Sequence, residues 1–478
     1  MSLTVAASKV PFHELPNQEP KRLFGTDGIR GEADRFPLDS PTVRAIAGSL
    51  ARHLTERTPG RAPRIIIGRD TRESGPRIER ELIAGALASG AEVQSAGIIT
   101  TPGVAFLARV LPADAGVVIS ASHNPYQDNG IKVFEPSGRK LDDATERLIE
   151  KDISDEAVVP AAPPDDREQS DAANQQDAAK LRTRYLDYLV HDVAHDLSLA
   201  NLTIVVDCAN GAAYQLAPQL LRRLGANVIA INNEPDGRNI NRDCGSLHLE
   251  VAQREVAPRD ADLGVAFDGD ADRALFIDGC GELVDGDATM WVMANYLKSR
   301  GELTGDAVVA TVMSNVGLEI ALRSRGITLT RTDVGDKYVL DELIRSGAAI
   351  GGEQSGHIIL PKLSLAGDGM MTTLYLLRAM RDQEKSLTAL TEGFRRYPQT
   401  LVNVRVREKR SFDELPAVQH LARAVEKKLG DRGRLLLRYS GTEPLARIMI
   451  EGENEAEVQA HASALAAAIR AELGADGS

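Results

Sequence analysis

Short apolar runs alternate with amphipathic segments along most of this 478-residue chain. The apolar runs have the length of buried strands, and the segments between them have the length and periodicity of helices. Strands separated by single helices form βαβ units, which build mostly parallel sheets covered by helices. We predict strands at 65–67, 117–119, 204–206, 228–231, 265–267, 308–312 and 348–350, and helices at 43–56, 78–89, 214–224, 288–298 and 338–344.

The composition is that of a folded protein and argues against several classes. Hydrophobic residues make up 43% of the chain and charged residues 26%, as in ordinary globular domains. The net charge of −13, with no basic stretch interleaved with aromatics, argues against nucleic-acid binding. No apolar run approaches the ~20 residues that cross a bilayer, and the first 22 residues do not resemble a signal peptide. Cys208, Cys244 and Cys280 lie far apart, so we expect reduced thiols in a cytoplasmic protein.

Changes in composition divide the chain. Residues 158–177 are rich in Pro, Ala, Asp and Gln and predict an exposed linker. Further boundaries are expected near 282–287 and near Tyr397. Beyond Tyr397, strands at 400–406, 435–439 and 447–451 and helices at 416–429 and 455–473 predict a smaller α+β domain. The expected domains are therefore 1–178, 179–284, 285–396 and 397–478.

A polar loop follows the apolar run 116–119. Pro125 prevents a helix from starting in it at once. Ser122 stands beside His123, and Lys132 follows ten residues after Ser122. A hydroxyl, an imidazole and an amine are the parts of an activated nucleophile and a proton-transfer group. A capped turn is the alternative interpretation, because Ser, Asn and Pro are common in turns.

The segment Asp268-Gly-Asp-Ala-Asp-Arg273 directly follows the predicted strand 265–267. Carboxylates at alternate positions of an extended chain project to one side, and a divalent cation would offset their repulsion. An EF-hand is excluded because the glycine and glutamate that it requires are replaced by Arg273 and Gly279. The all-oxygen set suits Mg²⁺, and the alternative is a solvated acidic turn. Arg273 could pair with the carboxylates or contact a phosphate.

Arg438-Tyr-Ser-Gly-Thr-Glu-Pro444 follows another strand-like run. A guanidinium beside two hydroxyls and accessible backbone N–H groups suits a phosphate, and Arg447 is close enough to contribute. A serine/threonine turn with a surface arginine is the alternative.

Two further motifs complete the set. Glu353-Gln-Ser-Gly-His357 supplies short polar side chains that suit sugar hydroxyls, although an ordinary turn fits it equally well. Phe24-Gly-Thr-Asp-Gly-Ile-Arg-Gly31 predicts a flexible loop that carries Arg30, and it lacks the spacing of a P-loop. Because ligand sites of α/β sheets lie beyond the carboxyl ends of strands, the four loops that follow strands predict a cleft formed by all four domains.

Together these motifs resemble the α-D-phosphohexomutase superfamily, in its order and over nearly the whole chain. The segments GTDGIRG, SASHNP with DNGIK, MSNVGLE, VGDKYV, GEQSGH and YPQTLVNVRV resemble its bacterial phosphoglucosamine mutase branch most closely. The resemblance implies an α/β fold with four domains: three α/β domains with mixed sheets and a C-terminal α+β domain. It also implies a possible homodimer.

The resemblance implies a reaction as well. Glucosamine 6-phosphate and glucosamine 1-phosphate, precursors of UDP-N-acetylglucosamine and peptidoglycan, would interconvert through a phosphoserine at Ser122. Glucosamine 1,6-bisphosphate would be the intermediate and activator. One Mg²⁺ per active site would bind Asp268, Asp270, Asp272 and an oxygen of the phosphorylated Ser122. The implied catalytic residues are Ser122, Lys132, His123 and Arg30, and the implied substrate-binding residues are Glu353, Ser355, His357, Arg438, Ser440, Gly441, Thr442, Arg447 and Arg273.

Three positions depart from the branch. Asp333 stands where many relatives carry Lys, which removes a possible phosphate contact. Tyr439 replaces Lys or Pro, and Ala271 replaces Gly, without loss of the charged groups. The alternatives are a phosphomannomutase or phosphoglucomutase of the same superfamily, a serine- and metal-dependent phosphatase, and a non-catalytic sugar-phosphate sensor.

Overall fold

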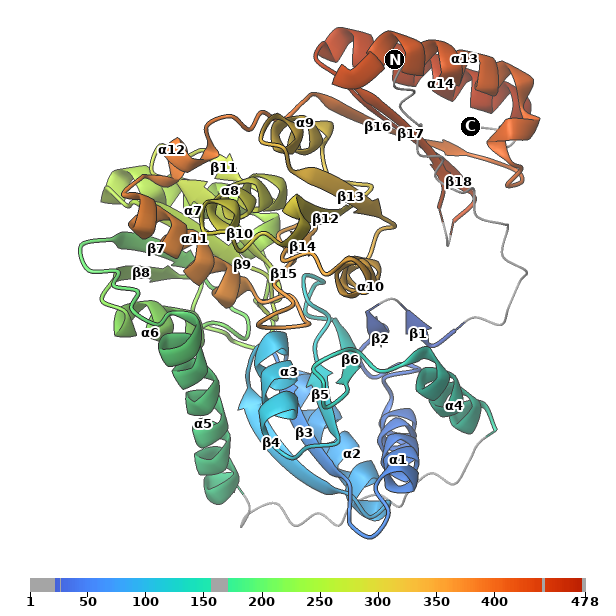
Figure 1. Cartoon of the computed structure of the whole chain (residues 1–478). Coiled ribbons are helices and arrows are strands. Elements are labelled where there is room, and N and C mark those ends of the chain that lie inside the picture. The colour runs from blue at the N-terminus through green and yellow to red at the C-terminus, as the bar shows by residue number, and fades with distance from the viewer. Residues whose placement is uncertain (1–21, 26, 156–170, 441–442, 475–478) are drawn as a thin grey trace. The chain divides into compact units, whose positions relative to one another are not determined.

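A computed structural model describes residues 22–25, 27–155, 171–440 and 443–474 (Figure 1). The chain divides between Arg396 and Tyr397 into two compact units. The first unit contains three mixed sheets with helices, and the second contains a smaller antiparallel sheet with two long helices. The expected fold class is therefore confirmed. In the part of the chain that the structure describes, no helix has the length and apolar character needed to span a membrane.

The first sheet has six strands in the order β1-β2-β6-β5-β3-β4. Its centre is parallel, since β3 pairs in parallel with both β4 and β5, but β6 runs antiparallel to β5 and β2. The strands are β1 Phe24–Gly25, β2 Gly28–Glu32, β3 Arg64–Arg69, β4 Glu92–Ile98, β5 Ala115–Ile119 and β6 Asp128–Phe134. The helices of this region are α1 Ser40–Arg57, α2 Gly75–Ala88, α3 Thr101–Val110 and α4 Asp143–Ser154, followed by α5 Asp171–Tyr188.

The second and third sheets repeat this plan with fewer strands. The second has the order β11-β10-β9-β7-β8 and the third the order β13-β12-β14-β15. The second contains β7 Thr203–Asp207, β8 Asn227–Ile231, β9 Leu263–Phe267, β10 Ala274–Asp278 and β11 Leu283–Val284, with α6 Leu216–Arg223 and α7 Leu249–Val256. The third contains β12 Ala307–Thr311, β13 Thr328–Thr332, β14 Gly351–Gly352 and β15 Ile358–Ile359, with α8 Gly286–Ser299, α9 Val316–Ser324, α10 Asp336–Ser346, α11 Gly369–Gln383 and α12 Leu387–Thr391.

The second unit is a three-stranded antiparallel sheet in the order β16-β18-β17. Its apolar core includes Ile448 from the sheet and Leu465 from the last helix. Its elements are β16 Gln399–Arg405, α13 Pro416–Leu429, β17 Arg434–Tyr439, β18 Leu445–Glu451 and α14 Glu455–Leu473.

A continuous apolar core joins the three sheets of the first unit. One cluster of buried side chains contains Ile66 from the first sheet, Val206 from the second and Ala310 from the third. Because protein interiors are close-packed and resist deformation, this core fixes the loops at the ends of the three sheets relative to one another.

Each functional loop joins two antiparallel strands, although the sequence pattern before Tyr397 predicts mostly parallel sheets. The connections are β5 to β6, β9 to β10 and β14 to β15 in the first unit and β17 to β18 in the second. Among the described residues of these connections there is no helix, so each chain segment turns back at once beside the strand that it has left. The loops are therefore held on both sides by strand hydrogen bonds.

Three local predictions are corrected. The strand expected at 348–350 begins at Gly351 instead, although Ile350 is fully buried. Within the segment 24–31, expected to be a flexible loop, residues 24–25 and 28–31 belong to the paired strands β1 and β2, and Ile29 of β2 pairs with Ile131 of the neighbouring strand. Residues 171–177, expected in a linker, belong to α5, where alanine and glutamine favour a helix. Residues 158–170 of that predicted linker, and the residues before 22, lie outside the described part of the chain.

Candidate active site

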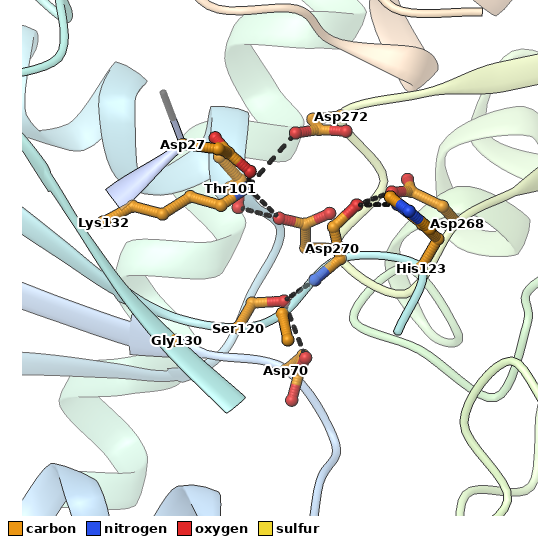
Figure 2. Close-up of polar contacts among 12 residues, drawn as sticks. Asp27, Asp70, Thr101, Ser120, His123, Gly130, Lys132, Asp268, Asp270 and Asp272 are labelled. Carbon is orange, nitrogen blue, oxygen red and sulfur yellow. Dashed lines mark hydrogen bonds and ion pairs between the residues drawn. The ribbon is translucent and has the colours of Figure 1, made fainter. Parts of the chain in front are cut away.

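The serine loop, residues 120–127, begins where the fully buried strand β5 ends. Ser122 is 1% exposed and has a φ of +53°, which is uncommon for a non-glycine residue. Its N–H donates to Ser120 Oγ at 2.9 Å, and Ser120 Oγ donates to Asp70 Oδ2 at 2.7 Å (Figure 2). These bonds hold the Ser122 hydroxyl in a defined, buried position.

Arg72, which the sequence patterns do not single out, holds the serine loop. Its fully buried guanidinium pairs with the equally buried Asp70, with Nε 2.8 Å from Oδ2. A guanidinium presents five N–H donors in one plane and can therefore bond several carbonyls at once. The guanidinium donates to three carbonyls of the serine loop, those of Ser122 at 2.9 Å, Asn124 at 2.8 Å and Pro125. It also donates to the carbonyl of Asp128, the first residue of β6, at 3.0 Å.

The carboxylate loop, residues 268–273, follows β9 and lies against the serine loop. A Cβ added to Gly269 would lie 2.5 Å from the Ser122 carbonyl oxygen, so only glycine allows this approach. Asp268, Asp270 and Asp272 are all buried, and one oxygen from each lies within 4.8 Å of the others. The sequence prediction that these three carboxylates converge is confirmed.

The three carboxylates could hold a metal ion. Among the described residues, Asp270 Oδ1 is a buried oxygen without a hydrogen-bond partner, which is costly unless a cation binds it. Asp272 Oδ1 makes no hydrogen bond either, but it already faces two cations, with His357 Nδ1 at 3.6 Å and Arg273 Nε at 3.8 Å. Burial, and then the charges of Asp272 and Asp270, raises the pKa of Asp268 well above its usual range. Asp268 Oδ2 accepts a short hydrogen bond from Ser122 Oγ. The hydroxyl therefore lies at the edge of the candidate metal site.

Lys132, on β6, lies fully buried among these acids (Figure 2). Its Nζ is 2.9 Å from Asp270 Oδ2, 3.3 Å from Asp272 Oδ2 and 3.1 Å from Asp27 Oδ2. Burial alone would lower the pKa of Lys132, but these carboxylates outweigh it and raise the pKa well above its ordinary value. The structure thus places Lys132 beside the serine and carboxylate loops and adds Asp27 to the group.

His123 contacts Ser122 but is held by a cation. Its Nδ1 lies 3.2 Å from Ser122 Oγ and 3.2 Å from Arg273 NH1. Because a guanidinium only donates, Arg273 uses the Nδ1 lone pair. Burial, together with the cationic Arg273 and Arg30, lowers the pKa of His123 to about 4. His123 is therefore neutral near pH 7 and, in this arrangement, its Nδ1 is not open to a proton from Ser122.

Arg30 contacts the serine loop from β2. Its NH1 donates to the Ala121 carbonyl at 3.2 Å, and its NH2 contacts Asp27. These contacts place the Arg30 guanidinium beside the serine loop.

The loop predicted to bind the sugar, residues 353–357 and called the sugar loop below, turns tightly between β14 and β15. The N–H of Gly356 donates to the Glu353 carbonyl at 3.0 Å. His357 is buried with Nδ1 3.6 Å from Asp272 Oδ1. Burial opposes protonation of His357, but the Asp272 charge outweighs it and raises the pKa of the imidazole to about 9. Ser355 Oγ lies 3.4 Å from Glu353 Oε2, and His357 is the one of these three side chains with a described contact to the carboxylates.

The predicted phosphate loop belongs to the second unit. Arg438 and Arg447 are directly opposite one another on β17 and β18 and therefore share one face of the sheet. Arg447 NH2 lies 3.3 Å from Oγ of the buried Ser440. This arrangement joins two half-buried guanidinium groups and a hydroxyl, as an anion site requires. Gly441 and Thr442 lie outside the described residues.

Several residues that shape the site have no motif of their own. Asp70 and Arg72 follow β3, and a charged run after an apolar strand is the sequence signal that could have found them. Thr101 Oγ1 donates to Asp270 Oδ2 at 2.6 Å from the start of α3. Lys140 and Asp336 form an ion pair of 2.6 Å, and nothing in their local sequence predicts it. Asp333 is exposed in the loop after β13, and its carbonyl accepts from Thr332 Oγ1 at 3.0 Å.

Comparison with known proteins identifies the family. Models described as phosphoglucomutase/phosphomannomutase match in four consecutive parts: alpha/beta/alpha domain I at residues 21–158, domain II at 183–281, domain III at 285–397 and the C-terminal domain at 401–468. A phosphoglucosamine mutase of Solibacter usitatus is 50% identical over 455 residues, which cover 95% of this chain and 99% of the relative. A phosphoglucosamine mutase of Syntrophotalea carbinolica is 46% identical over 454 residues, covering 95% and 98%.

Solved structures share the fold at lower identity. A phosphoglucomutase/phosphomannomutase family protein from Burkholderia thailandensis superposes with a TM-score of 0.76 at 24% identity, covering 94% of this chain and 97% of that one. An N-acetylphosphoglucosamine mutase from Aspergillus fumigatus gives 0.62 at 18% identity, covering 94% and 95%. The family expected from the motifs is confirmed: the chain belongs to the phosphoglucosamine mutase branch of the phosphoglucomutase/phosphomannomutase family.

Proposed function

We propose that this enzyme interconverts glucosamine 6-phosphate and glucosamine 1-phosphate through a phosphoserine at Ser122. Glucosamine 1,6-bisphosphate is the intermediate and the activator. The observation that carries the proposal is the buried Ser122 hydroxyl, which donates to Asp268 beside two further carboxylates and Lys132. Relatives named phosphoglucosamine mutase, which match 95% of the chain, support it.

The carboxylate loop is the proposed metal site. Asp268, Asp270 and Asp272, with an oxygen of phosphorylated Ser122, would hold one Mg²⁺, which prefers oxygen ligands and keeps phosphate oxygens in its shell. The buried Asp270 Oδ1, which has no hydrogen-bond partner, fits this ion. When bound, it neutralises charge on the phosphoryl group. The Aspergillus fumigatus N-acetylphosphoglucosamine mutase was solved with GlcNAc-6P and magnesium, which supports the choice.

Ser122 gives its phosphoryl group to one sugar hydroxyl and takes the other phosphoryl group back. In each transfer the bond from phosphorus to the leaving oxygen breaks as the bond to the accepting oxygen forms, and the sugar hydroxyl loses or regains its proton. We assign these proton transfers to Lys132, because Arg273 already uses His123 Nδ1. The neighbouring carboxylates favour the protonated form of Lys132, so it would accept a proton only where Mg²⁺ bound by Asp270 and Asp272 offsets their charge. His123 is then a supporting contact of Ser122, and Arg30 adds positive charge beside the serine loop.

Substrate binding is assigned to both units. Glu353, Ser355 and His357 supply hydrogen bonds for the sugar, and Arg273 supplies positive charge beside them. In the second unit the proposed phosphate-binding residues are Arg438, Ser440, Gly441, Thr442 and Arg447. Ser122 needs a site that excludes water, because water would hydrolyse the phosphoserine.

The organisation follows from the same proposal. The domains are 1–178, 179–284, 285–396 and 397–478, which carry the serine, carboxylate, sugar and phosphate loops respectively. The enzyme acts in the cytoplasm on a small sugar phosphate and forms a homodimer.

A mutase assay with the purified enzyme and Mg²⁺ tests the function. Glucosamine, glucose and mannose phosphates are compared at equal concentration, and we expect the highest kcat/KM with glucosamine phosphate. A preference of about tenfold or more for glucose or mannose phosphate, ~1.4 kcal/mol in transition-state binding, would contradict the assignment and indicate a phosphoglucomutase or phosphomannomutase. Net phosphate release faster than isomerisation would indicate a phosphatase.

A further inference from the structure

Six side chains form a closed ring in which acidic and basic groups alternate. Lys132 Nζ lies 3.3 Å from Asp272 Oδ2 and 3.1 Å from Asp27 Oδ2. Lys140 Nζ then lies 2.6 Å from both Asp27 Oδ1 and Asp336 Oδ2. His357 closes the ring, 3.8 Å from Asp336 Oδ2 and 3.6 Å from Asp272 Oδ1. In order, the members are Asp272, Lys132, Asp27, Lys140, Asp336 and His357.

The ring connects the carboxylate loop and the sugar loop to β6, the strand that follows the serine loop. Asp272 comes from the carboxylate loop and His357 from the sugar loop. Lys132 lies on β6, the strand that follows the serine loop, and Lys140 is bridged to the end of the same strand at Phe134. Asp336 is the first residue of α10. A displacement of the carboxylate loop or of the sugar loop would therefore separate charges at two contacts of the ring.

Asp336 lies where it can hold the sugar loop in place. It begins α10, where the positive end of the helix dipole favours a carboxylate. The preceding Gly335 donates its N–H to Glu353 Oε1 at 3.2 Å. The Lys140 and Asp336 side chains are only 21% and 19% exposed, so water screens their attraction less than at an open surface. The start of α10 thus contacts both Glu353 and His357, at the two ends of the sugar loop.

We propose that Lys140 and Asp336 are positioning residues, whose ion pair closes this ring and keeps the sugar loop in register with Ser122 and the carboxylate loop. The inference rests on the proposed function, because this register matters when a sugar held by residues 353–357 exchanges phosphate with Ser122. Neither Lys140 nor Asp336 is assigned to the chemistry itself.

The neighbouring pair Arg139–Asp341 is a matched control. It joins the same segment after β6 to the same helix α10, at 3.0 Å. Its side chains are 43% and 49% exposed and it lies outside the ring. Exposed pairs contribute little, so its loss should leave the register unchanged.

The test compares Lys140→Ala, Lys140→Arg and Asp336→Asn with Arg139→Ala in the full-length enzyme. We expect Lys140→Ala and Asp336→Asn to lower kcat/KM by about 10- to 100-fold, as is usual for residues that orient others in a site. Lys140→Arg keeps the charge and should retain most activity. Arg139→Ala should change kcat/KM by less than about twofold. Equal losses in Lys140→Ala and Arg139→Ala would overturn the proposal.

Exchanging the charges of Lys140 and Asp336 distinguishes a ring of charges from an isolated ion pair. Lys140→Asp combined with Asp336→Lys restores the pair but places the new acid beside Asp27 and the new lysine beside His357. The ring therefore predicts no recovery of kcat/KM over Lys140→Asp alone, and recovery to the level of the unmodified enzyme would contradict it.

Amide hydrogen exchange of residues 353–357 provides a readout that does not need activity. The Gly356 and Glu353 amides are bonded within the turn, to the Glu353 and His357 carbonyls at 3.0 Å each. Lys140→Ala and Asp336→Asn should speed their exchange at unchanged melting temperature, whereas Arg139→Ala should not. Unchanged exchange in all three variants would overturn the ring. An unmodified enzyme without mutase activity would overturn the proposed function alone.

Discussion

The serine and carboxylate loops of the first unit and the phosphate loop of the second carry similar polar residues but are built differently. Ser122 and Asp268 are 1% and 0% exposed, and the guanidinium of Arg72 spans four carbonyls behind Ser122. Arg438 and Arg447 instead stand half-buried, opposite one another on a small antiparallel sheet.

Because the two regions are built differently, we expect substitutions in them to impair the enzyme in different ways. In the first region the bonds that place the reacting groups also hold the fold, so a substitution there changes catalysis and stability together. In the second region the charged groups lie on the face of a sheet whose core is formed by other residues. Binding should therefore weaken there without loss of the fold.

The largest expected effect is that of Ser122→Ala. Without the phosphate carrier, kcat should fall by about 10⁴-fold or more, as when a nucleophile is removed from other enzymes. A coupled mutase assay and intact-mass spectrometry measure turnover and phosphorylation in parallel, with Ser137→Ala, at an exposed serine, as the control. Turnover near normal in Ser122→Ala would remove Ser122 as the carrier.

Metal removal and Asp270→Asn come next. A chelator should abolish turnover and added Mg²⁺ should restore it, while Asp270→Asn should lose about 10²–10³-fold in kcat, the scale of removing one electrostatic contact to the reacting group. Isothermal titration of the metal-free proteins with Mg²⁺ separates binding from catalysis. Mg²⁺ binding by Asp270→Asn as tight as that of the unmodified protein would place the metal elsewhere.

Arg72→Lys tests whether the buried bonds behind the serine loop support both the fold and catalysis. A lysine keeps the charge but cannot reach four carbonyls and Asp70, so the free energy of unfolding should fall by about 3–5 kcal/mol, the scale of breaking a buried ion pair. Urea unfolding and the mutase assay measure the two effects together. Lost activity at full stability would show that Arg72 acts on the loop alone.

Arg438→Ala tests the phosphate loop of the second unit and has the smallest expected effect. Loss of a charged hydrogen bond costs about 1.5–3 kcal/mol, so KM for the sugar phosphate should rise roughly 10- to 100-fold with little change in melting temperature. An unchanged KM contradicts the phosphate site. A large fall in melting temperature would show that Arg438 supports the fold instead.

The sequence was sufficient for the local features and for the family. Strand ends followed by Ser122, by Asp268 and by Glu353 predicted the loops, because buried strands and polar turns differ sharply in composition. It did not predict that the serine and carboxylate loops return as antiparallel strands, since β6 begins with the polar residues Asp128 and Asn129 and β10 ends at Asp278. Arg72 and the Lys140–Asp336 pair were also missed, because their partners are set by tertiary packing and lie far away in the sequence.

Phosphosite mapping of the purified enzyme tests the central claim most directly. The intact mass and the modified residue are determined before and after incubation with Mg²⁺ and glucosamine 1,6-bisphosphate. The account predicts one phosphoryl group per chain, on Ser122, which is lost to glucosamine 1-phosphate or glucosamine 6-phosphate when either is added. A phosphoryl group on another residue, or full turnover by an enzyme whose Ser122 never becomes phosphorylated, would contradict it.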